Sequence, residues 1–449
     1  MVLAIAVPIL IQNAITNFVS LLDNIMVGQI GTEQMSGVAV ANQLIFVFEI
    51  CIFGIISGAS IFGAQYYGSR NIRGFQNTFR FKLIYGALML VAGLLIFWFF
   101  GDSLIGLYLH EGSDAGNLEE TLRYGRLYLN IMLIGLPAHV MTQAYASTLR
   151  EMGKTVLPMN AGIAAIFVNM TLNYILIFGK FGAPVLGVAG AAIATVISRF
   201  AEMLIIIILV HRREKEFEFV HGIYRTLWVP WELQKKILLK GSPLMINEAL
   251  WSGGMAVLNQ CYSMRGLAVI AGINISSTIS NVFNVLFIAL GSSVSIIVGQ
   301  LLGAGKMEEA KDTDTKLIAF SVMGCVVMGG IMAVVAPAFP QIYNTTDEVR
   351  GLAARFITIS ALFMPLQAFM HACYFTLRSG GKTIVTLFFD SVFVWVISIP
   401  MAMALTKLTG LSIIWIYFSC QAVEIIKCII GYVLLKKGVW LHNIVESGR

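Results

Sequence analysis

Long apolar runs separated by short polar segments follow one another along almost the whole chain. A helix needs roughly 20 apolar residues to cross the hydrocarbon layer of a bilayer, and twelve runs are long enough. They lie near residues 3–27, 35–62, 80–101, 123–147, 156–178, 185–210, 237–261, 267–300, 316–341, 350–376, 382–405 and 411–435. The pattern predicts an all-α integral membrane protein with twelve transmembrane helices.

One polar stretch is longer than the other connections and separates six apolar runs from six. The expected domains are an N-terminal six-helix lobe at 1–210, a cytoplasmic linker at 211–236 and a C-terminal six-helix lobe at 237–449. In the linker, Trp228 and Trp231 stand close to Lys235 and Lys236, a composition typical of a segment that lies at the membrane surface. A plain solvated linker explains the same composition equally well.

The two halves of the chain repeat each other. Gly63-Ala64-Gln65-Tyr66-Tyr67-Gly68 matches Val298-Gly299-Gln300-Leu301-Leu302-Gly303, and a proline, Pro8 or Pro243, stands 57 residues before each glutamine. Because six spans return the chain to the side on which it started, both halves have the same orientation. Two pseudo-symmetric lobes are therefore expected around a central cleft, and rocking one lobe against the other gives alternating access.

Composition and charge indicate that lipid surrounds the chain. Charged residues make up only 12% of it and hydrophobic residues 58%, whereas soluble domains carry about a quarter charged residues. Most of the 30 Lys and Arg fall on alternate loops, for example Arg70, Arg73, Arg80 and Lys82 after the second run. The positive-inside rule then puts both termini of this multi-pass plasma-membrane protein in the cytoplasm. No basic patch typical of nucleic-acid binding is found.

The chain opens inside an apolar run, with neither a basic leader nor a small-residue cleavage site. Residues 3–27 are therefore expected to be a first span and not a signal peptide, although the missing basic anchor suggests a truncated start. The six cysteines lie mostly in apolar runs and form no C-x-x-C pair, as is typical of small buried hydrophobes.

Motifs of other function classes are absent. The Gly-Lys-Thr triplets at 153–155 and 381–383 lack the glycine that a phosphate-binding loop carries five residues earlier. No H-E-x-x-H motif indicates an intramembrane enzyme, and no filter loop indicates an ion channel. The sequence therefore predicts neither enzymatic activity nor a cofactor, and an ion gradient is expected to supply the energy.

The ordered motifs resemble those of the multidrug and toxic compound extrusion (MATE) family. The residues that carry the resemblance are Pro8, Asp23 to Gly28 with Gly31, Gly63 to Gln65, Gly241 to Pro243 with Glu248, and Gly299 with Gln300. The resemblance covers essentially the whole chain and implies export of amphipathic, often cationic compounds in exchange for protons or sodium ions. A monomer in the lipid bilayer is expected.

A lipid-linked oligosaccharide flippase of the same broad superfamily is the alternative function. Such a protein should line its cavity with arginines that hold pyrophosphate. Only Arg199 and Arg355 are candidates, and each lies near the end of a span. Export is therefore favoured, and an ion channel is the least favoured alternative.

Carboxylates inside the spans are the first candidates for ion coupling, because a charge in the bilayer core is costly and is retained for function. Asp23 leads, since it lies in the first span 15 residues after Pro8, a proline that kinks the helix and is expected to act as its hinge. The resemblance implies the same arrangement, with an aspartate that loads the coupling ion. The other candidates are Glu49, Glu202, Glu248, Asp390 and Glu424.

Asn169 and Asn173 are four residues apart and share one face of the fifth span. Related proton-coupled members often have an aspartate at the second position, so Asn173 removes a titratable group from the expected pair. Asp23, Asn169 and Asn173 can together ligate a sodium ion, a hard cation that takes oxygen donors. Amides hydrogen-bonded between helices explain the two asparagines equally well.

In the second half, Glu248 lies five residues after Pro243 and resembles an acidic residue that other branches of the family use for coupling. The tenth span offers only Gln367 and His371 where those branches have an aspartate partner. Asp390 is shallower and is expected to line the inner mouth of the cleft. Three further polar residues of the spans are candidates for contact with the substrate: Gln43, Asn274 and Asn281.

Two pairs of opposite charges stand three residues apart inside spans, Arg199 with Glu202 and Glu424 with Lys427. Residues at this spacing share a helix face, so both are interpreted as structural ion pairs. Glu49 fits neither pattern, and its role stays open.

Overall fold

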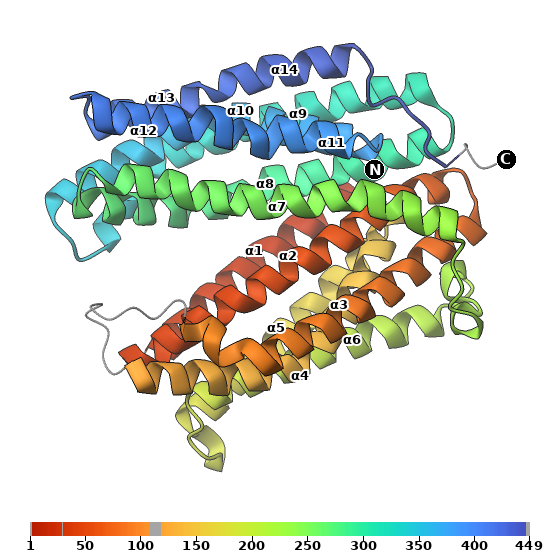
Figure 1. The fold of residues 1–449 in the computed structure, drawn as a ribbon, viewed down its shortest axis with the longest axis horizontal. Coiled ribbons are helices and arrows are strands. Elements are labelled where there is room, and N and C mark those ends of the chain that lie inside the picture. Colours follow the sequence, from red (N-terminus) through yellow and green to blue (C-terminus); the bar gives the residue numbers. More distant parts are fainter. Residues whose placement is uncertain (1, 29, 107–117, 446–449) are drawn as a thin grey trace. The chain divides into compact units, whose positions relative to one another are not determined.

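A computed structural model describes residues 2–28, 30–106 and 118–445. This part of the chain is almost entirely helical (Figure 1). The long helices are α1 (Val2–Gly28), α2 (Thr32–Gly68), α3 (Ile72–Gly106), α4 (Leu118–Glu151), α5 (Val156–Phe178), α6 (Val188–Arg212), α7 (Trp231–Ser263), α8 (Leu267–Gly303), α9 (Met307–Val335) and α10 (Asp347–Ser379).

The last two spans are each made of more than one helical piece. One runs from α11 (Thr383–Leu387) through the π-helical segments η5 (Phe388–Val392) and η6 (Val394–Ser398) into α12 (Ile399–Leu408). The other joins α13 (Ile413–Ala422) to α14 (Glu424–Lys436). Among the described residues, ten helical segments are long and apolar enough to cross a membrane, and α1 and α7 complete the predicted twelve.

The chain forms two compact units. Unit 1 comprises Met1–Leu10, Ala64–Arg70 and Leu239–Arg449, and unit 2 comprises Ile11–Gly63 and Asn71–Leu238. Three helices therefore pass from one unit into the other: α1 after Leu10, α2 after Gly63 and α7 after Leu238.

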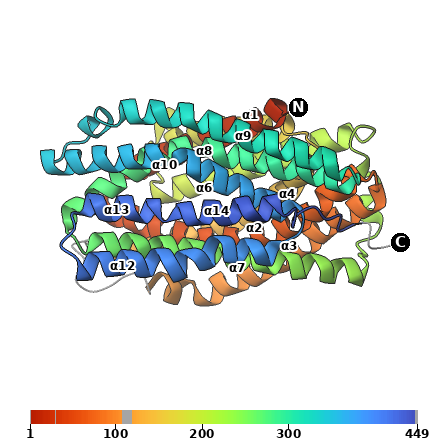
Figure 2. The same ribbon diagram turned by 90° about the horizontal axis from the view of Figure 1, so that it is seen from above.

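Unit 2 is held together by apolar side chains from several helices. Ile52 of α2, Leu129 and Leu136 of α4 and Ala192 of α6 are at most 1% exposed and belong to one hydrophobic cluster. In unit 1, α8, α9 and α10 lie side by side (Figure 2). Burying these faces leaves the remaining apolar surface of each helix for lipid, as expected for spans.

The repeated glutamine–glycine motif forms a reciprocal helix crossing inside unit 1. A Cβ atom added at Gly68 of α2 would overlap the backbone of Gln300 on α8, and one added at Gly303 would overlap the backbone of Gln65. Small residues allow backbones to approach this closely. Each copy of the motif therefore uses its glycine to accommodate the glutamine of the other copy, which gives the sequence repeat a structural purpose.

The segment after α14 binds to this crossing. Gln65 is fully buried, and its Nε2 donates to the carbonyls of Ser379 at 2.9 Å and His442 at 3.2 Å. Its Oε1 accepts from the Ile444 amide at 2.8 Å, and Asn443 Nδ2 donates to the Gly303 carbonyl at 3.3 Å. Asn443 and Ile444 are buried and are therefore part of the core of unit 1.

The helices extend beyond the predicted spans, and this corrects the count of loop cations. Lys82 lies inside α3 and is fully buried, and Arg80 is 8% exposed. Lys82 Nζ donates to Ser147 Oγ and Thr148 Oγ1, both at 3.0 Å, and forms an ion pair with Glu151. Interpreting Arg80 and Lys82 as loop residues was wrong because α3 begins at Ile72, before the apolar run starts.

Candidate functional site

Asp23 lies near the end of α1, partly buried within unit 2. Asn173 of α5 donates its Nδ2 to Asp23 Oδ1 at 2.6 Å. The same Nδ2 lies 3.1 Å from Oδ1 of Asn169, one helical turn earlier. The structure thus brings together the three residues that the sequence predicts for ion coupling.

Asn169 has a further polar neighbour, Thr195 of α6. In one orientation of its amide, Asn169 Nδ2 donates to Thr195 Oγ1 at 3.3 Å, which leaves its oxygen 3.1 and 3.3 Å from the two carboxylate oxygens of Asp23. Acceptors this close repel each other unless a proton or cation lies between them. Exchanging the amide N and O lets Asn169 donate to Asp23 and accept from Thr195 instead. The exchanged orientation leaves no oxygen of Asn169 facing the carboxylate.

Asn173 supplies a buried oxygen that has no protein partner. The residue is 1% exposed, and within the described ranges its Oδ1 receives no hydrogen bond. Leaving a buried acceptor unsatisfied costs about 1–3 kcal/mol. Carboxylate, amide and hydroxyl oxygens are the ligands that hard cations take, so this donor set fits a sodium ion, and the Asp23 carboxylate can alternatively hold a proton.

Pro8 lies inside α1, close to the point where the helix leaves unit 1 and enters unit 2. Proline removes one hydrogen bond from the helix ladder and crowds the preceding turn. The α1 ladder is therefore weakened next to the boundary between the units, on the same helix as Asp23. This position is consistent with the hinge that the sequence predicts.

Asp390 of unit 1 has a different environment. Its Oδ1 lies 3.0 Å from Lys427 Nζ on α14, and its Oδ2 accepts from Asn247 Nδ2 on α7 at 3.1 Å. Lys427 also lies 3.5 Å from Glu424 Oε2, which confirms that pair. Asp390 is on the π-helical segment η5, a geometry that is frequent at functional sites. This carboxylate already has a cation of its own.

Glu248 lies beside this cluster on α7. It is close enough to Tyr374, Arg378 and Asp390 to interact with them electrostatically. Its neighbour Asn247 accepts from Ser391 Oγ at 2.7 Å. Glu248 and Asp390, both predicted for the second lobe, therefore belong to one polar network in unit 1.

The three remaining candidates are not part of either cluster. Gln43 of α2 and Asn274 and Asn281 of α8 are exposed on the surface of their units. Polar side chains within spans face the bundle interior or a water-filled space far more often than lipid. These three side chains therefore stay candidates for contact with the substrate.

Two charged groups have partners that sequence reasoning did not find. Arg199 lies 3.0 Å from Glu49 Oε1, with His139 3.9 Å from the same oxygen. Among the described residues Arg199 forms no ion pair with Glu202, so that interpretation was wrong. The preference for a partner on the same helix hid the contact between α6 and α2, and Glu49 now has a structural role.

Asp314 of α9 is a buried carboxylate that the sequence analysis missed. It is 3% exposed and accepts from Thr376 Oγ1 of α10 at 2.6 Å. It stands just before the predicted 316–341 span, among residues interpreted as loop. The early start of α9 at Met307 places it inside the helix, and the apolar run alone gave no signal of this.

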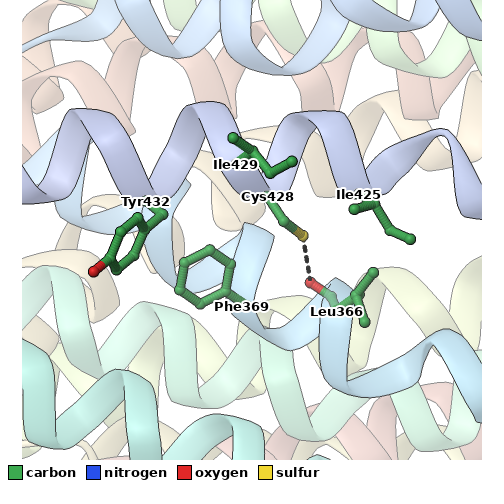
Figure 3. A pocket seen from close by; sticks show the side chains of 6 residues that line it. All are labelled: Leu366, Phe369, Ile425, Cys428, Ile429 and Tyr432. Carbon is green, nitrogen blue, oxygen red and sulfur yellow. Dashed lines mark hydrogen bonds between the residues drawn. The ribbon is translucent and has the colours of Figure 1, made fainter.

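A cavity of about 440 Å³ lies between α10 and α14 in unit 1 (Figure 3). Its lining is apolar apart from Cys428, whose Sγ lies 3.8 Å from the Leu366 carbonyl, and the ring of Tyr432 closes one end. None of the candidate polar residues lines it. This cavity is therefore not the coupling site.

Comparison with known proteins agrees with this architecture. The model of the MatE family matches residues 8–175 and 243–404. A probable multidrug resistance protein NorM of Thermotoga maritima is 24% identical over 443 residues, covering 97% of this chain and 92% of the relative. A probable multidrug resistance protein YoeA of Bacillus subtilis is 24% identical over 437 residues, covering 95% and 91%.

Among solved structures, a MATE protein in a bent conformation has a TM-score of 0.87 at 19% identity, covering 98% of this chain and 94% of that chain. This similarity confirms the fold of the twelve helices. The family model covers well over half of the chain, and in both halves. The chain therefore belongs to the MatE family of multidrug and toxic compound extrusion transporters.

Proposed function

We propose that this chain is a secondary active exporter of amphipathic, often cationic compounds, exchanging them for protons or sodium ions by alternating access. The observation that carries the proposal is the environment of Asp23. The carboxylate accepts a hydrogen bond from Asn173, lies beside the amide of Asn169, and forms no ion pair within the described ranges. A carboxylate in a span without an internal cation is stabilised by binding one from outside.

The oxygen atoms around Asp23 support a specific coupling step. With a cation bound, Asn169 turns its oxygen toward Asp23, and the free oxygen of Asn173 gains a ligand. Without it, Asn169 donates to the carboxylate instead. Binding thus changes how α1, α5 and α6 are joined, and a difference of only 1–3 kcal/mol between two packings is enough to couple sites.

The substrate path is proposed to include the exposed polar side chains of the spans, Gln43, Asn274 and Asn281. Glu248 adds a further carboxylate, which lies close to the phenol of Tyr374 and to the Asp390 pair. An acidic residue of this kind attracts a cationic compound. Multidrug resistance is the activity named for the relatives from Thermotoga maritima and Bacillus subtilis, which supports a broad substrate range.

The proposal places both termini on the cytoplasmic side of the plasma membrane, with one chain as the transport unit. The bias of Lys and Arg toward alternate loops supports this orientation. The flippase alternative is less well supported, since Arg199 is engaged by Glu49 and Arg355 is exposed.

The test uses purified chain in liposomes loaded with a cationic dye. Efflux is driven separately by a proton gradient and by a sodium gradient, each collapsed by its own ionophore as a control. We expect one of the gradients to drive efflux, and Asp23→Asn to reduce it at least tenfold while Glu216→Gln, a surface carboxylate, leaves it unchanged. Efflux that neither gradient drives, or that Asp23→Asn does not reduce, contradicts the proposal.

A further inference from the structure

The connection between α6 and α7 is folded onto unit 2 and is not a loose linker. Its apolar side chains Phe217, Phe219, Val220 and Ile223 are at most 3% exposed. The ring of Phe219 packs edge-on against Phe75 and Phe79 of α3 at centroid distances of 5.8 and 5.0 Å. One face of the connection is therefore fixed by core packing.

Hydrogen bonds to α3 hold the same face in place. Gln76 Nε2 donates to the His221 carbonyl at 3.1 Å, and Arg80 Nε donates to the Ile223 carbonyl at 3.3 Å. On the other side of the turn, Gln234 Nε2 donates to the Val229 carbonyl at 2.8 Å. The side chains of the connection that point away from unit 2 are thus attached to a backbone that is held in place.

The opposite face presents large apolar side chains to the surroundings. Leu227 is 54% exposed, Trp228 70% and Trp231 63%. A soluble surface rarely gathers such residues within five positions, and exposed apolar patches of this kind mark contact with a membrane or a partner. Tryptophan in particular is enriched where a protein meets the headgroup layer.

Basic residues surround these side chains. Arg225, Lys235 and Lys236 are exposed and take part in no ion pair within the described part of the chain. Two acidic residues of the connection are paired, Glu214 2.8 Å from His221 and Glu216 2.8 Å from Lys154, while Glu218 is exposed. The apolar side chains therefore have three exposed basic residues close to them in the sequence against one exposed acid, Glu232, between Arg225 and Lys236.

The helix that follows shows where this face lies with respect to the bilayer. From Trp231 and Lys235, the exposed side of α7 continues through Leu239, which is 60% exposed, to Ile246, which is 46% exposed. This apolar stripe on a spanning helix faces lipid. Trp231 and Lys235 stand at its polar end, at the depth where a bilayer has its headgroups.

We propose that Arg225, Leu227, Trp228, Trp231, Lys235 and Lys236 form a site for anionic phospholipid headgroups, which we call the linker patch. The tryptophans and the leucine enter the interface, and the three basic side chains contact headgroup phosphates. Anionic lipid attracts each basic residue near the surface with enough energy to raise affinity about fivefold. The linker patch therefore binds the connection between the two halves to the membrane surface. The affinity of the patch for the membrane depends on the charge of the lipid.

The test measures lipid binding by the full chain in detergent. Short-chain phosphatidylglycerol and phosphatidylcholine are titrated separately, and the increase in Tm gives the apparent affinity. The linker-patch variant Arg225→Gln/Lys235→Gln/Lys236→Gln should bind phosphatidylglycerol on the order of 100-fold more weakly, with phosphatidylcholine unaffected. The matched control Arg212→Gln/Arg213→Gln/Lys215→Gln removes the same charge from the end of α6 and the start of the connection and should retain binding.

A second readout locates the tryptophans. Phospholipid brominated near the headgroup should quench part of the fluorescence of the wild type, and Trp228→Phe/Trp231→Phe should lose that part. Equal weakening in both charge variants, or unchanged quenching, overturns the site. If glycerol phosphate bound as tightly as the lipid, the patch would be a site for free phosphate and the proposal would be overturned. Saturation of the patch by a protein partner in lipid-free detergent would overturn the proposal as well.

Discussion

Asp23 in unit 2 and Asp390 in unit 1 are both carboxylates inside membrane-spanning helices, yet their charges are balanced in different ways. Asp390 has Lys427 at 3.0 Å and an amide on its other oxygen. Asp23 accepts from the amide of Asn173 and lies beside the amide of Asn169. Asp390 is thus paired with a cation of the chain itself, whereas the described partners of Asp23 are neutral.

The comparison shows how two similar halves can divide their work. A buried ion pair fixes the helices that carry it, because separating the two charges leaves each of them desolvated and unpaired. A carboxylate with neutral partners can instead bind and release a small cation without breaking a salt bridge. We infer that the Asp390 cluster stabilises unit 1 and that Asp23 is the exchangeable site.

The largest effect is expected from breaking the internal pair. Lys427→Met leaves Asp390 and Glu424 without their cation and should reduce the free energy of unfolding by about 3–5 kcal/mol, seen as a lower Tm in detergent. The double variant Asp390→Asn/Lys427→Met removes both charges and should recover much of the loss. A single variant as stable as the wild type would remove the distinction drawn between the two aspartates.

A smaller effect is expected from Glu248, the acidic neighbour of the Asp390 pair. Glu248→Gln removes one negative charge from the spans, and loss of about 1 kcal/mol of attraction reduces export of cationic dyes roughly fivefold. Neutral compounds should be exported at nearly the wild-type rate. Asp390→Asn should discriminate less between the two, because its charge is already met by Lys427. Equal losses for charged and neutral substrates would indicate a structural role for Glu248.

Sequence reasoning reached the spans, the repeat and the residues around Asp23, but it did not reach the long-range ion pairs. Twelve apolar runs fix the helices because the bilayer demands length and apolarity from each of them. Asn169 and Asn173 were found together because helical spacing puts them on one face. Their meeting with Asp23 was implied by the family resemblance and is visible only once α1 and α5 are packed.

The missed contacts share a physical cause. Lys427 has a local acid three residues away, and the nearer partner, Asp390, lies on a different helix. Arg199 was paired with Glu202 for the same reason, although Glu49 of α2 holds it. Spacing rules describe one helix at a time, whereas the partner of a buried charge is set by how helices pack. The hydrogen bonds between Gln65 and residues 442–444 also join parts of the chain that are far apart in the sequence, so spacing rules do not predict them.

The smallest effect is expected at the surface of unit 2, where Lys154 Nζ donates to Glu216 Oε1 at 2.8 Å and lowers the pKa of this carboxyl. A lowered pKa stabilises the fold above the ordinary glutamate pKa, and the contribution is lost as pH falls through the folded value. Because the pair is exposed, solvent screens it, and Glu216→Gln should leave Tm at neutral pH nearly unchanged. A clear fall in Tm would mean that surface pairs matter as much as the buried ones.

The central claim is that the exchangeable cation binds at Asp23 and not at Asp390. Binding is measured directly on the purified chain, by calorimetric titration with sodium and by proton release on addition of a cationic drug. The account predicts that Asp23→Asn abolishes whichever of the two signals the wild type gives, that Asn173→Ala weakens it, and that Asp390→Asn retains it if the variant folds. Cation binding that survives Asp23→Asn and disappears in a folded Asp390→Asn variant would contradict the account.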